Sequence, residues 1–461
     1  MLRLAALRLF ACLCSILPLA LGGCSASRAP AELGRDEAAI AELRDRIVRL
    51  RGLSLRREIV GPPRAPIPAP PERAFEQEYG PVPPPVLSHA YRRIGLLPRG
   101  GDLARPLGDF ERLRKIAAYD PGAGVLLLSP EAIRLGQAVA GEDVRSALAI
   151  PRGLALAHAL QEQRFRWQDR LRVIFLEDRK LALRAVAAGS AVLTALAAAG
   201  RGETADRLRD AGLIAAELER LGARLPDLLR AKLVFPIREG TRFVSWAYAA
   251  RGWSGVDALF ERPPLSTAQV LHPERYFIRR QDPLRLVPSG LARRMGQSAA
   301  VDQTIGEALL RVPLRSALPA AEALEIASRW RGDTLRVYGH GPEAVTAWFT
   351  AWSDAEAARA FERAYRRSLE ESRGLWFTGD ADTQRAAAGG GRSAILRRKG
   401  AIVLLLDGAP EREADELSAD ALRDLEILQE PFPPEFDLAR PALSRSPEAG
   451  SAPRPGRRGL R

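Results

Sequence analysis

The sequence predicts a helix-rich α+β fold: a first section with two buried core helices, then a small section with an antiparallel sheet. Residues 146–167 carry apolar side chains over a broad face, which indicates a core helix. Residues 178–199 are almost wholly Ala, Leu and Val and predict a second buried helix. The third observation is a hairpin pattern, two apolar runs at 393–398 and 401–406 joined by Lys399-Gly400.

The sheet section is expected to begin near residue 301 and to alternate strands with helices. Residues 334–338 and 344–352 look like strands, and a helix at 354–369 separates them from the hairpin. Residues 412–428 are expected to form a closing helix, and Gly389-Gly390-Gly391 a loop. Strand pairs separated by a helix predict a small antiparallel sheet with helices on one face.

The N-terminus carries the pattern of an export signal. Two arginines among the first eight residues precede an apolar run to Leu21, which is short for a bilayer span, and then Gly22-Gly23-Cys24. A cysteine after two glycines resembles the lipobox of bacterial lipoproteins. The resemblance implies cleavage after residue 23, an acylated Cys24 as membrane anchor and, with Ser25 following, sorting to the outer membrane. The alternative is an ordinary signal peptide with a chance cysteine.

The cysteine content excludes several kinds of site. Cys12 and Cys14 precede the expected cleavage point, so the mature chain keeps only Cys24. A large body can bury enough apolar surface to fold without disulfides. A thiol nucleophile, a CxxC redox pair and a Cys-ligated zinc site are therefore not expected.

The net charge of +13 comes almost wholly from arginine, because the chain has four lysines. One interpretation is a basic face for nucleic acid. The arginines are nevertheless scattered among acids, as in Glu42-Leu43-Arg44-Asp45-Arg46, and no basic stripe interleaved with aromatic residues occurs. The sequence therefore favours a surface that does not bind nucleic acid and has at most some affinity for anionic envelope polymers.

The chain is expected to divide into five parts. Residues 36–51 have apolar positions at spacings of three and four, which indicates a helix, and the proline-rich residues 61–86 predict an extended linker. The C-terminal tail is rich in Pro, Ser, Gly and Arg, which predicts disorder. The expected parts are a signal peptide (1–23), a tether, amphipathic helix and linker (24–88), the core-helix section (89–300), the α+β section (301–430) and a disordered basic tail (431–461).

The first core helix contains Leu154-Ala155-Leu156-Ala157-His158-Ala159-Leu160-Gln161-Glu162-Gln163-Arg164-Phe165. This segment resembles the zinc helix H-E-x-x-H-A-L-Q-D-Q-H-F of zincin-like, gluzincin-type metallopeptidases, many of them exported bacterial proteins. In that motif two histidines four residues apart bind zinc, and the glutamate between them is the general base. His158 matches the second histidine, whereas Leu154 and Ala155 occupy the positions of the first histidine and the general base.

The family's second helix supplies the third zinc ligand, a glutamate in an E-G-x-A stretch. Residues 184–191, R-A-V-A-A-G-S-A, place Ala188 at that position. The resemblance extends over roughly residues 40–430, through further patches in the same order at 49–53, 118–121, 228–236, 267–276 and 330–333. It implies a zincin-like fold for residues 89–300, with a degenerate zinc motif.

The lost ligands predict a pseudoenzyme. One imidazole cannot hold zinc against water, since tight binding needs three protein ligands, and Ala155 cannot accept a proton from water. Leu and Ala in place of polar ligands also predict a filled, apolar site. No catalytic residue, metal or other cofactor is therefore expected, and zinc enters only if other ligands around His158 have replaced the lost ones.

Three polar residues define the expected residual cleft: His158, Glu162 and His272. Glu162 lies four residues after His158, so the two share a helix face, and the spacing allows a hydrogen bond between them. His158 is expected to be a hydrogen-bonded core histidine, and His272, before Pro273, to hold a loop.

The leading hypothesis is a catalytically inactive, metallopeptidase-like lipoprotein of the bacterial envelope. It would bind a peptide, a protein or an envelope component through the former substrate cleft, facing the periplasm or the cell surface. Two alternatives stay open. One is an active metallohydrolase with relocated ligands around His158, and the other is a purely structural envelope lipoprotein.

Overall fold

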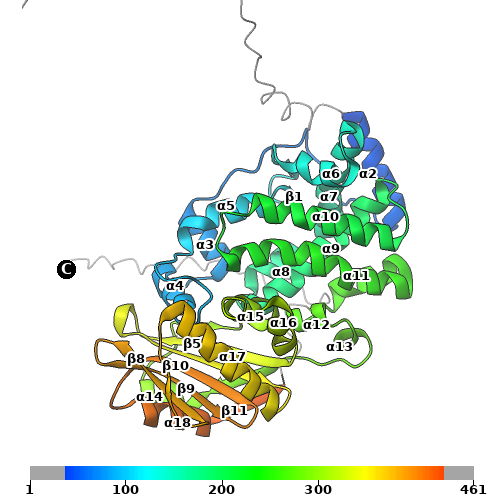
Figure 1. Cartoon of the computed structure of the whole chain (residues 1–461). Helices are drawn as coiled ribbons and strands as arrows, with labels where there is room; N and C mark the ends of the chain where they lie inside the picture. The colour runs from blue at the N-terminus through cyan, green and yellow to red at the C-terminus, as the bar shows by residue number, and fades with distance from the viewer. Residues whose placement is uncertain (1–36, 430–461) are drawn as a thin grey trace, which may run out of the picture.

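The computed structural model describes residues 37–429. The expected signal peptide, the Cys24 anchor and the basic tail lie outside the described residues. The predicted fold class is confirmed, because the described chain is rich in helices and carries an antiparallel sheet in its C-terminal part. Figure 1 shows the helical section stacked on the sheet section.

The helical section places the two predicted core helices at α7 and α9. α7 extends over Val144–Phe165 and α9 over Glu177–Ala198, within two residues of the expected bounds. The other elements of this section are α2 (Glu37–Arg51), α3 (Pro71–Tyr79), α4 (Pro84–Arg93), α5 (Ala104–Arg114), β1 (Ala117–Asp120), β2 (Val125–Leu128), α6 (Ala132–Ala140), α8 (Trp167–Val173), α10 (Thr204–Leu221), α11 (Asp227–Glu261), α12 (Thr267–Leu271) and α13 (Glu274–Phe277).

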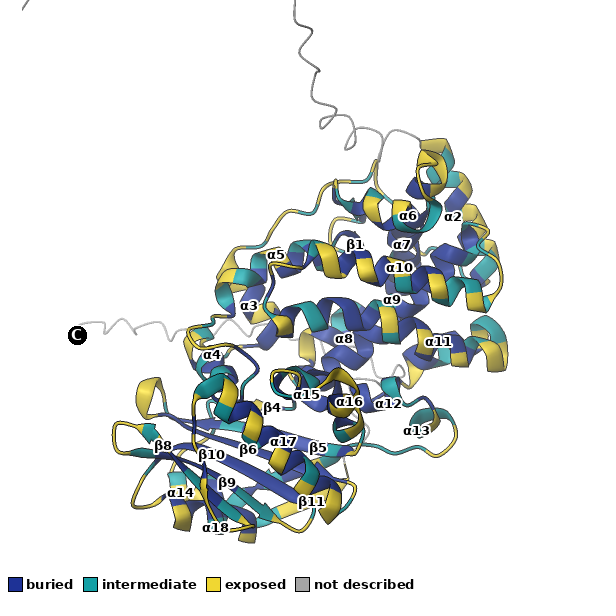
Figure 2. Cartoon of the chain, viewed as in Figure 1, coloured by how far each residue is buried: buried dark blue, intermediate teal, exposed yellow. Residues whose placement is uncertain are grey.

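Helix α9 is the centre of the helical section. It packs against α7 on one side and α11 on the other, and Figure 2 shows it buried among its neighbours. At its crossing with α11, a Cβ on Gly189 would lie 2.3 Å from the carbonyl carbon of Gly240, so only glycine permits this approach. Among the described helices, α9 alone is long and apolar enough to cross a membrane, and 89% of its apolar window is buried inside the protein.

The prediction of an extended linker over residues 61–86 is wrong in its second half. Helices α3 and α4 form there, because Pro71 and Pro84 each stand at the start of a helix, where the missing N–H costs no hydrogen bond. Phe75 and Tyr79 of α3 are buried in the main core. The expected boundary at residue 88 therefore falls inside a packed helix.

The C-terminal section is built on a seven-stranded antiparallel sheet of order β4-β5-β6-β10-β9-β8-β7. Its strands and helices, with a separate strand pair β3–β11, are β3 (Leu284–Pro288), α14 (Ser289–Met295), β4 (Val301–Gln303), α15 (Gly306–Leu314), α16 (Ala320–Ala327), β5 (Trp330–Tyr338), η2 (Gly341–Glu343), β6 (Val345–Trp352), α17 (Ala355–Arg373), β7 (Thr378–Gly379), β8 (Thr383–Gly389), β9 (Arg392–Lys399), β10 (Ile402–Pro410), α18 (Ala414–Arg423) and β11 (Leu425–Gln429). The predicted hairpin is confirmed as β9–β10, with Lys399 opposite Ile402.

The expectation of helices on one face of the sheet is wrong, because both faces are covered. Trp348 of β6 packs in the core beneath α17, whereas its neighbour Phe349 packs in the core that includes α14 and α18. All eight residues of β6 are buried, which requires cover on both sides.

The expected elements at both ends of this section need correction. The closing helix ends at Arg423, and β11 follows it and pairs with β3. The section therefore reaches back to Leu284 rather than beginning at residue 301. Strand β8 was not expected, since its run of three alanines carries little strand propensity.

The two sections share one hydrophobic core. Leu181 and Leu183 of α9 belong to the same buried cluster as Leu309 of α15 and Trp330 of β5. The backbone N–H of Asp178, at the start of α9, also donates to the carbonyl of Thr304 at 3.0 Å. The sheet section thus closes directly on one end of the central helix.

Candidate functional site

A cavity of about 400 Å³ lies where the zinc motif resemblance predicted a former metal site. Leu154 and His158 of α7 and Ala188 of α9 all line this site cavity. The two helices pack side by side, and β1 lies against α7, so one hollow collects the three positions. The prediction of a filled site is therefore wrong. Alanine is much smaller than glutamate, and close-packed neighbours do not collapse fully into the space that a lost side chain leaves.

His158 is not the hydrogen-bonded core histidine that we expected. Its Nδ1 is buried without a hydrogen-bond partner among the described residues, and the same holds for the indole Nε1 of Trp167. The two rings lie 5.6 Å apart between centroids. Burial, with a smaller contribution from Arg114, lowers the pKa of His158 to about 4, so the imidazole is neutral at pH 7. Two residues that line the cavity, His158 and Trp167, thus each have a buried ring nitrogen without a hydrogen-bond partner among the described residues.

Glu162 does not pair with His158. Its Oε2 accepts a hydrogen bond from the backbone N–H of Gln168 at 2.8 Å, at the start of α8. The chain turns between α7 and α8 at Arg166, whose φ of 51° is left-handed. Glu162 therefore stabilises this turn, and burial raises its pKa to about 7. Glu162 does lie one helical turn after His158, as the spacing predicted. Its carboxylate nevertheless bonds to the backbone N–H of Gln168 and not to the imidazole.

The residues present do not fit a zinc ion. Leu154 and Ala188 present only hydrocarbon to the cavity beside His158. Ala155, at the general-base position, is fully buried and does not line the cavity. Within residues 37–429, no three His, Cys, Asp or Glu side chains gather as a metal-binding group.

Among the described residues, strand β1 pairs with β2 on one edge and with no strand on the other, and β1 lines the site cavity. On its β2 side, the carbonyls of Ile116 and Asp120 accept hydrogen bonds from Ser129 and Gly124. By the alternation of an antiparallel ladder, Ala117 and Tyr119 direct their backbone groups to the opposite edge. Of these groups, the carbonyl of Tyr119 accepts a bond from Gln168 Nε2 at 3.1 Å.

The far edge of the hairpin is closed. The N–H of Arg64 donates to the carbonyl of Leu126, and the N–H of Leu128 donates to the carbonyl of Arg64, both at 2.9 Å. Residues 117–121 all line the site cavity. The hairpin thus has one edge available, and the strand that carries it forms part of the cavity wall.

A buried charge network adjoins the cavity. Glu78 of α3 accepts two hydrogen bonds from Arg184, at 2.6 Å each. It also forms an ion pair with Lys232 at 2.6 Å. Lys232 also pairs with Glu177. Burial alone would raise the pKa of Glu78, but Arg184 and Lys232 hold it well below its usual value. Arg184 and Lys232 line the cavity, and both are matched by carboxylates.

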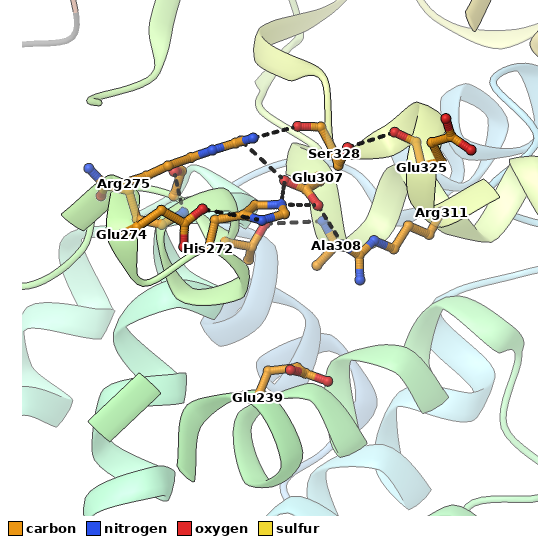
Figure 3. A network of polar contacts seen from close by, with 12 residues as sticks. Glu239, His272, Glu274, Arg275, Glu307, Ala308, Arg311, Glu325 and Ser328 are labelled. Carbon is orange, nitrogen blue, oxygen red and sulfur yellow. Dashed lines mark hydrogen bonds and ion pairs between the residues drawn. The ribbon is translucent and has the colours of Figure 1, made fainter. Parts of the chain in front are cut away.

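His272 lies outside the site cavity, so the expected cleft of His158, Glu162 and His272 does not form. Its Nε2 is 3.0 Å from both carboxylate oxygens of Glu307, which is fully buried on α15 (Figure 3). Arg275 and Arg311 also approach Glu307. These contacts tie the junction of α12 and α13 to α15.

The sequence reasoning missed three residues that line the cavity, Trp167, Arg184 and Lys232, and it missed Glu78, the buried partner of Arg184 and Lys232. A signal for two of them was present. Arg184 and Lys232 each interrupt an apolar helical run, and a charged residue at such a position predicts a buried ion pair. Glu78 lay in the stretch expected to be a linker, so its role as their partner had no signal in the sequence.

Comparisons with known proteins give one match. Residues 293–418 match a family described as a domain of unknown function, DUF8575. No curated protein and no solved structure matches the chain. The matched region covers most of the sheet section and does not include α7, α9 or the site cavity.

Proposed function

We propose that this protein is a catalytically inactive, metallopeptidase-like envelope lipoprotein that binds a peptide or an extended protein segment in the site cavity. The observation that carries the proposal is the position of β1, whose unpaired edge adjoins a cavity of about 400 Å³. An extended peptide adds to such an edge by backbone hydrogen bonds, and a neighbouring pocket selects its side chains.

The walls of the cavity indicate what a bound peptide would contact. On the edge away from β2, the N–H and C=O of Ala117 and the N–H of Tyr119 have no partner within residues 37–429. Leu154, Ala188 and Trp167 supply apolar surface, and His158 adds a neutral polar ring. A cavity of this size holds one or two side chains of a ligand, so we expect an apolar or aromatic residue at the pocket.

The absence of catalysis is proposed from the chemistry of the side chains. Within residues 37–429, His158 belongs to no group of three His, Cys, Asp or Glu side chains that could hold a metal ion, and Ala155 has no group that takes a proton. The nearest carboxylate along α7, Glu162, is engaged by the backbone of Gln168. The one carboxylate among the residues that line the cavity, Asp120, accepts hydrogen bonds from the backbone N–H groups of Gly122 and Ala123, so a metallohydrolase with relocated ligands would need further donors.

The proposed location rests on the sequence around Cys24. A lipid anchor there would tether the described body to the envelope through residues 25–36, on the outer membrane. Mass spectrometry of the mature N-terminal peptide tests this part, because acylation adds the mass of the fatty chains to Cys24. An unmodified Cys24 in the membrane fraction would contradict it.

The binding proposal is tested by filling the cavity. Peptides selected from a random display library against the wild-type protein should lose their affinity for Ala188→Phe, since the added ring occupies about the volume that a ligand side chain needs. The matched control is Ala216→Phe, which places the same ring on an exposed position of α10 outside the cavity. Affinities are measured by fluorescence polarisation.

Two results would overturn the proposal. Peptides that bind Ala188→Phe as tightly as the wild type would place the binding site elsewhere. Stoichiometric zinc in the purified protein, lost in His158→Ala, together with chelator-sensitive peptide hydrolysis, would establish the metallohydrolase alternative instead.

A further inference from the structure

A second hollow of about 660 Å³ lies between α4 and one end of the sheet, far from the zinc-like motif in sequence. We call it the basic cleft and define it by its charged wall residues, Arg92, Arg93, Arg99, Arg373, Arg392, Glu343 and Asp407. Five guanidiniums face two carboxylates, a formal excess of three positive charges. The arginines come from α4, the loop after it, the end of α17 and the start of β9, so they surround the hollow from several sides.

Two of the five arginines are held by the buried Asp407. Arg373 Nη1 lies 2.5 Å from Asp407 Oδ2, and Arg93 Nε lies 3.6 Å from Asp407 Oδ1. Arg93 also donates to the carbonyl of Asp407 at 3.0 Å. These contacts join α4 to the sheet, and we assign them to the structure of the cleft rather than to a ligand.

The other three arginines have little or no carboxylate partner. Arg99 has no hydrogen-bond or ion-pair partner within residues 37–429, and Arg92 donates only to the carbonyl of Gly101, at 2.6 Å. Arg392 reaches Glu343 at 3.9 Å, but the Glu343 side chain is 84% exposed, so water weakens this pair. Most of the positive excess therefore belongs to arginines that no acid within residues 37–429 neutralises.

The glycine turn between β8 and β9 leaves one side of the cleft open. Gly389, Gly390 and Gly391 have φ values of 85°, 59° and 70°, and a Cβ on any of them would meet nothing within 4 Å. Gly389 and Gly390 line the cleft. A bare backbone beside a cationic wall lets a bulky anion approach closely, because no side chain intervenes.

His89 lines the same wall of the cleft. Its Nε2 is buried and has no hydrogen-bond partner in the described part of the chain. An unpaired buried nitrogen is costly unless a ligand or water bonds to it. His89 lies on α4 three residues before Arg92, on the same side of the helix.

We infer that the basic cleft is a binding site for a phosphate-bearing ligand, separate from the site cavity. A phosphate group carries about two negative charges and three acceptor oxygens, which suits guanidiniums that converge from different elements. A single carboxylate is planar and monovalent and is satisfied by one arginine. Soluble compounds and lipid headgroups both carry such a phosphate, and the experiment separates these two sources.

The test uses the whole purified chain and titration calorimetry with inorganic pyrophosphate. We expect saturable binding that Arg92→Gln/Arg99→Gln weakens by about tenfold or more, since both groups donate charge-assisted hydrogen bonds. Neither arginine pairs with a carboxylate within the described part of the chain, so the variant should fold normally. The matched control is Arg224→Gln, because Arg224 is exposed, has no partner within residues 37–429 and lies outside the cleft.

A second arm uses sedimentation with phosphatidylcholine vesicles, with and without phosphatidic acid. Binding only to the acidic vesicles, lost in the double variant, would assign the site to a lipid headgroup, and pyrophosphate binding alone would assign it to a soluble phosphate compound. Ala188→Phe should change neither result, which keeps this inference independent of the proposed function. The inference is overturned if neither probe binds, if citrate binds as tightly as pyrophosphate, or if the double variant binds like Arg224→Gln.

Discussion

The site cavity and the basic cleft both contain cationic side chains, but the two hollows use them differently. Arg184 and Lys232 at the site cavity are buried and share the carboxylates of Glu78 and Glu177. Arg99 at the basic cleft is exposed and has no partner within residues 37–429. The number of positive charges in a hollow is therefore a poor guide to whether it binds an anion. Whether each charge already pairs with a carboxylate is a better guide.

Burial explains the difference. A guanidinium or ammonium taken out of water needs a carboxylate, because the cost of desolvation is otherwise several kcal/mol. Arg184 and Lys232 meet this requirement inside the fold, so carboxylates of the protein offset these two charges and leave them little attraction for an anion. The exposed Arg99 and the half-buried Arg92 keep part of their water and pair with no acid within residues 37–429, so they retain their charge for an incoming ligand.

The largest effect is expected when a buried partner is removed. Glu78→Gln keeps the shape of the side chain but removes the negative charge that pairs with Arg184 and Lys232. Breaking a buried pair in this way typically costs about 3–5 kcal/mol. We therefore expect the free energy of unfolding, measured by urea denaturation at pH 7, to fall by that amount. A loss below about 1 kcal/mol, as for exposed pairs, would show that the two hollows do not differ as we describe.

The next effect follows from the neutral imidazole of His158. Its pKa of about 4 in the fold lies below the usual value of 6.5, so the unfolded chain binds a proton that the folded chain does not. The contribution of His158 to the free energy of unfolding is therefore fully present above pH 6.5 and is lost as the pH falls from 6.5 to 4. The shift corresponds to a loss on the order of 3 kcal/mol.

The measurement is the free energy of unfolding of wild type and His158→Phe across this pH range. The variant should lose less stability between pH 6.5 and pH 4 than the wild type, whereas the difference between them should stay constant above pH 7. Parallel curves throughout the range would mean that His158 titrates normally and that the cavity wall is wet.

The fold was more predictable than either hollow. The apolar periods of α7 and α9 and the Lys399-Gly400 turn of the β9–β10 hairpin depend on short stretches of sequence, and these predictions are confirmed. Strand β11 was missed because only its pairing with β3, more than a hundred residues earlier, makes it a strand. Such long-range pairing leaves no local pattern.

The candidate site was predicted in position but not in character. The motif resemblance placed Leu154, His158 and Ala188 together, and the structure brings them to one cavity. The prediction of a filled interior was wrong, because packing around a lost side chain depends on the assembled fold. The prediction of a bond between His158 and Glu162 was wrong because the N–H of Gln168, brought near by the fold, bonds to Glu162 instead. The basic cleft had no signal, since its arginines are spread over three hundred residues.

The smallest effect on stability is expected from Glu343→Gln, the counterpart of Glu78→Gln in the basic cleft. Glu343 lies 3.9 Å from Arg392 with its side chain 84% exposed, and such a pair contributes about 0–1 kcal/mol. The free energy of unfolding at pH 7 should therefore stay within about 1 kcal/mol of the wild type. Pyrophosphate should bind the variant several-fold more tightly, because one of the two acids that oppose it is gone. Equal affinity in the two proteins would place Glu343 outside the field of the ligand, and a large loss of stability would show that this exposed pair behaves like the buried one.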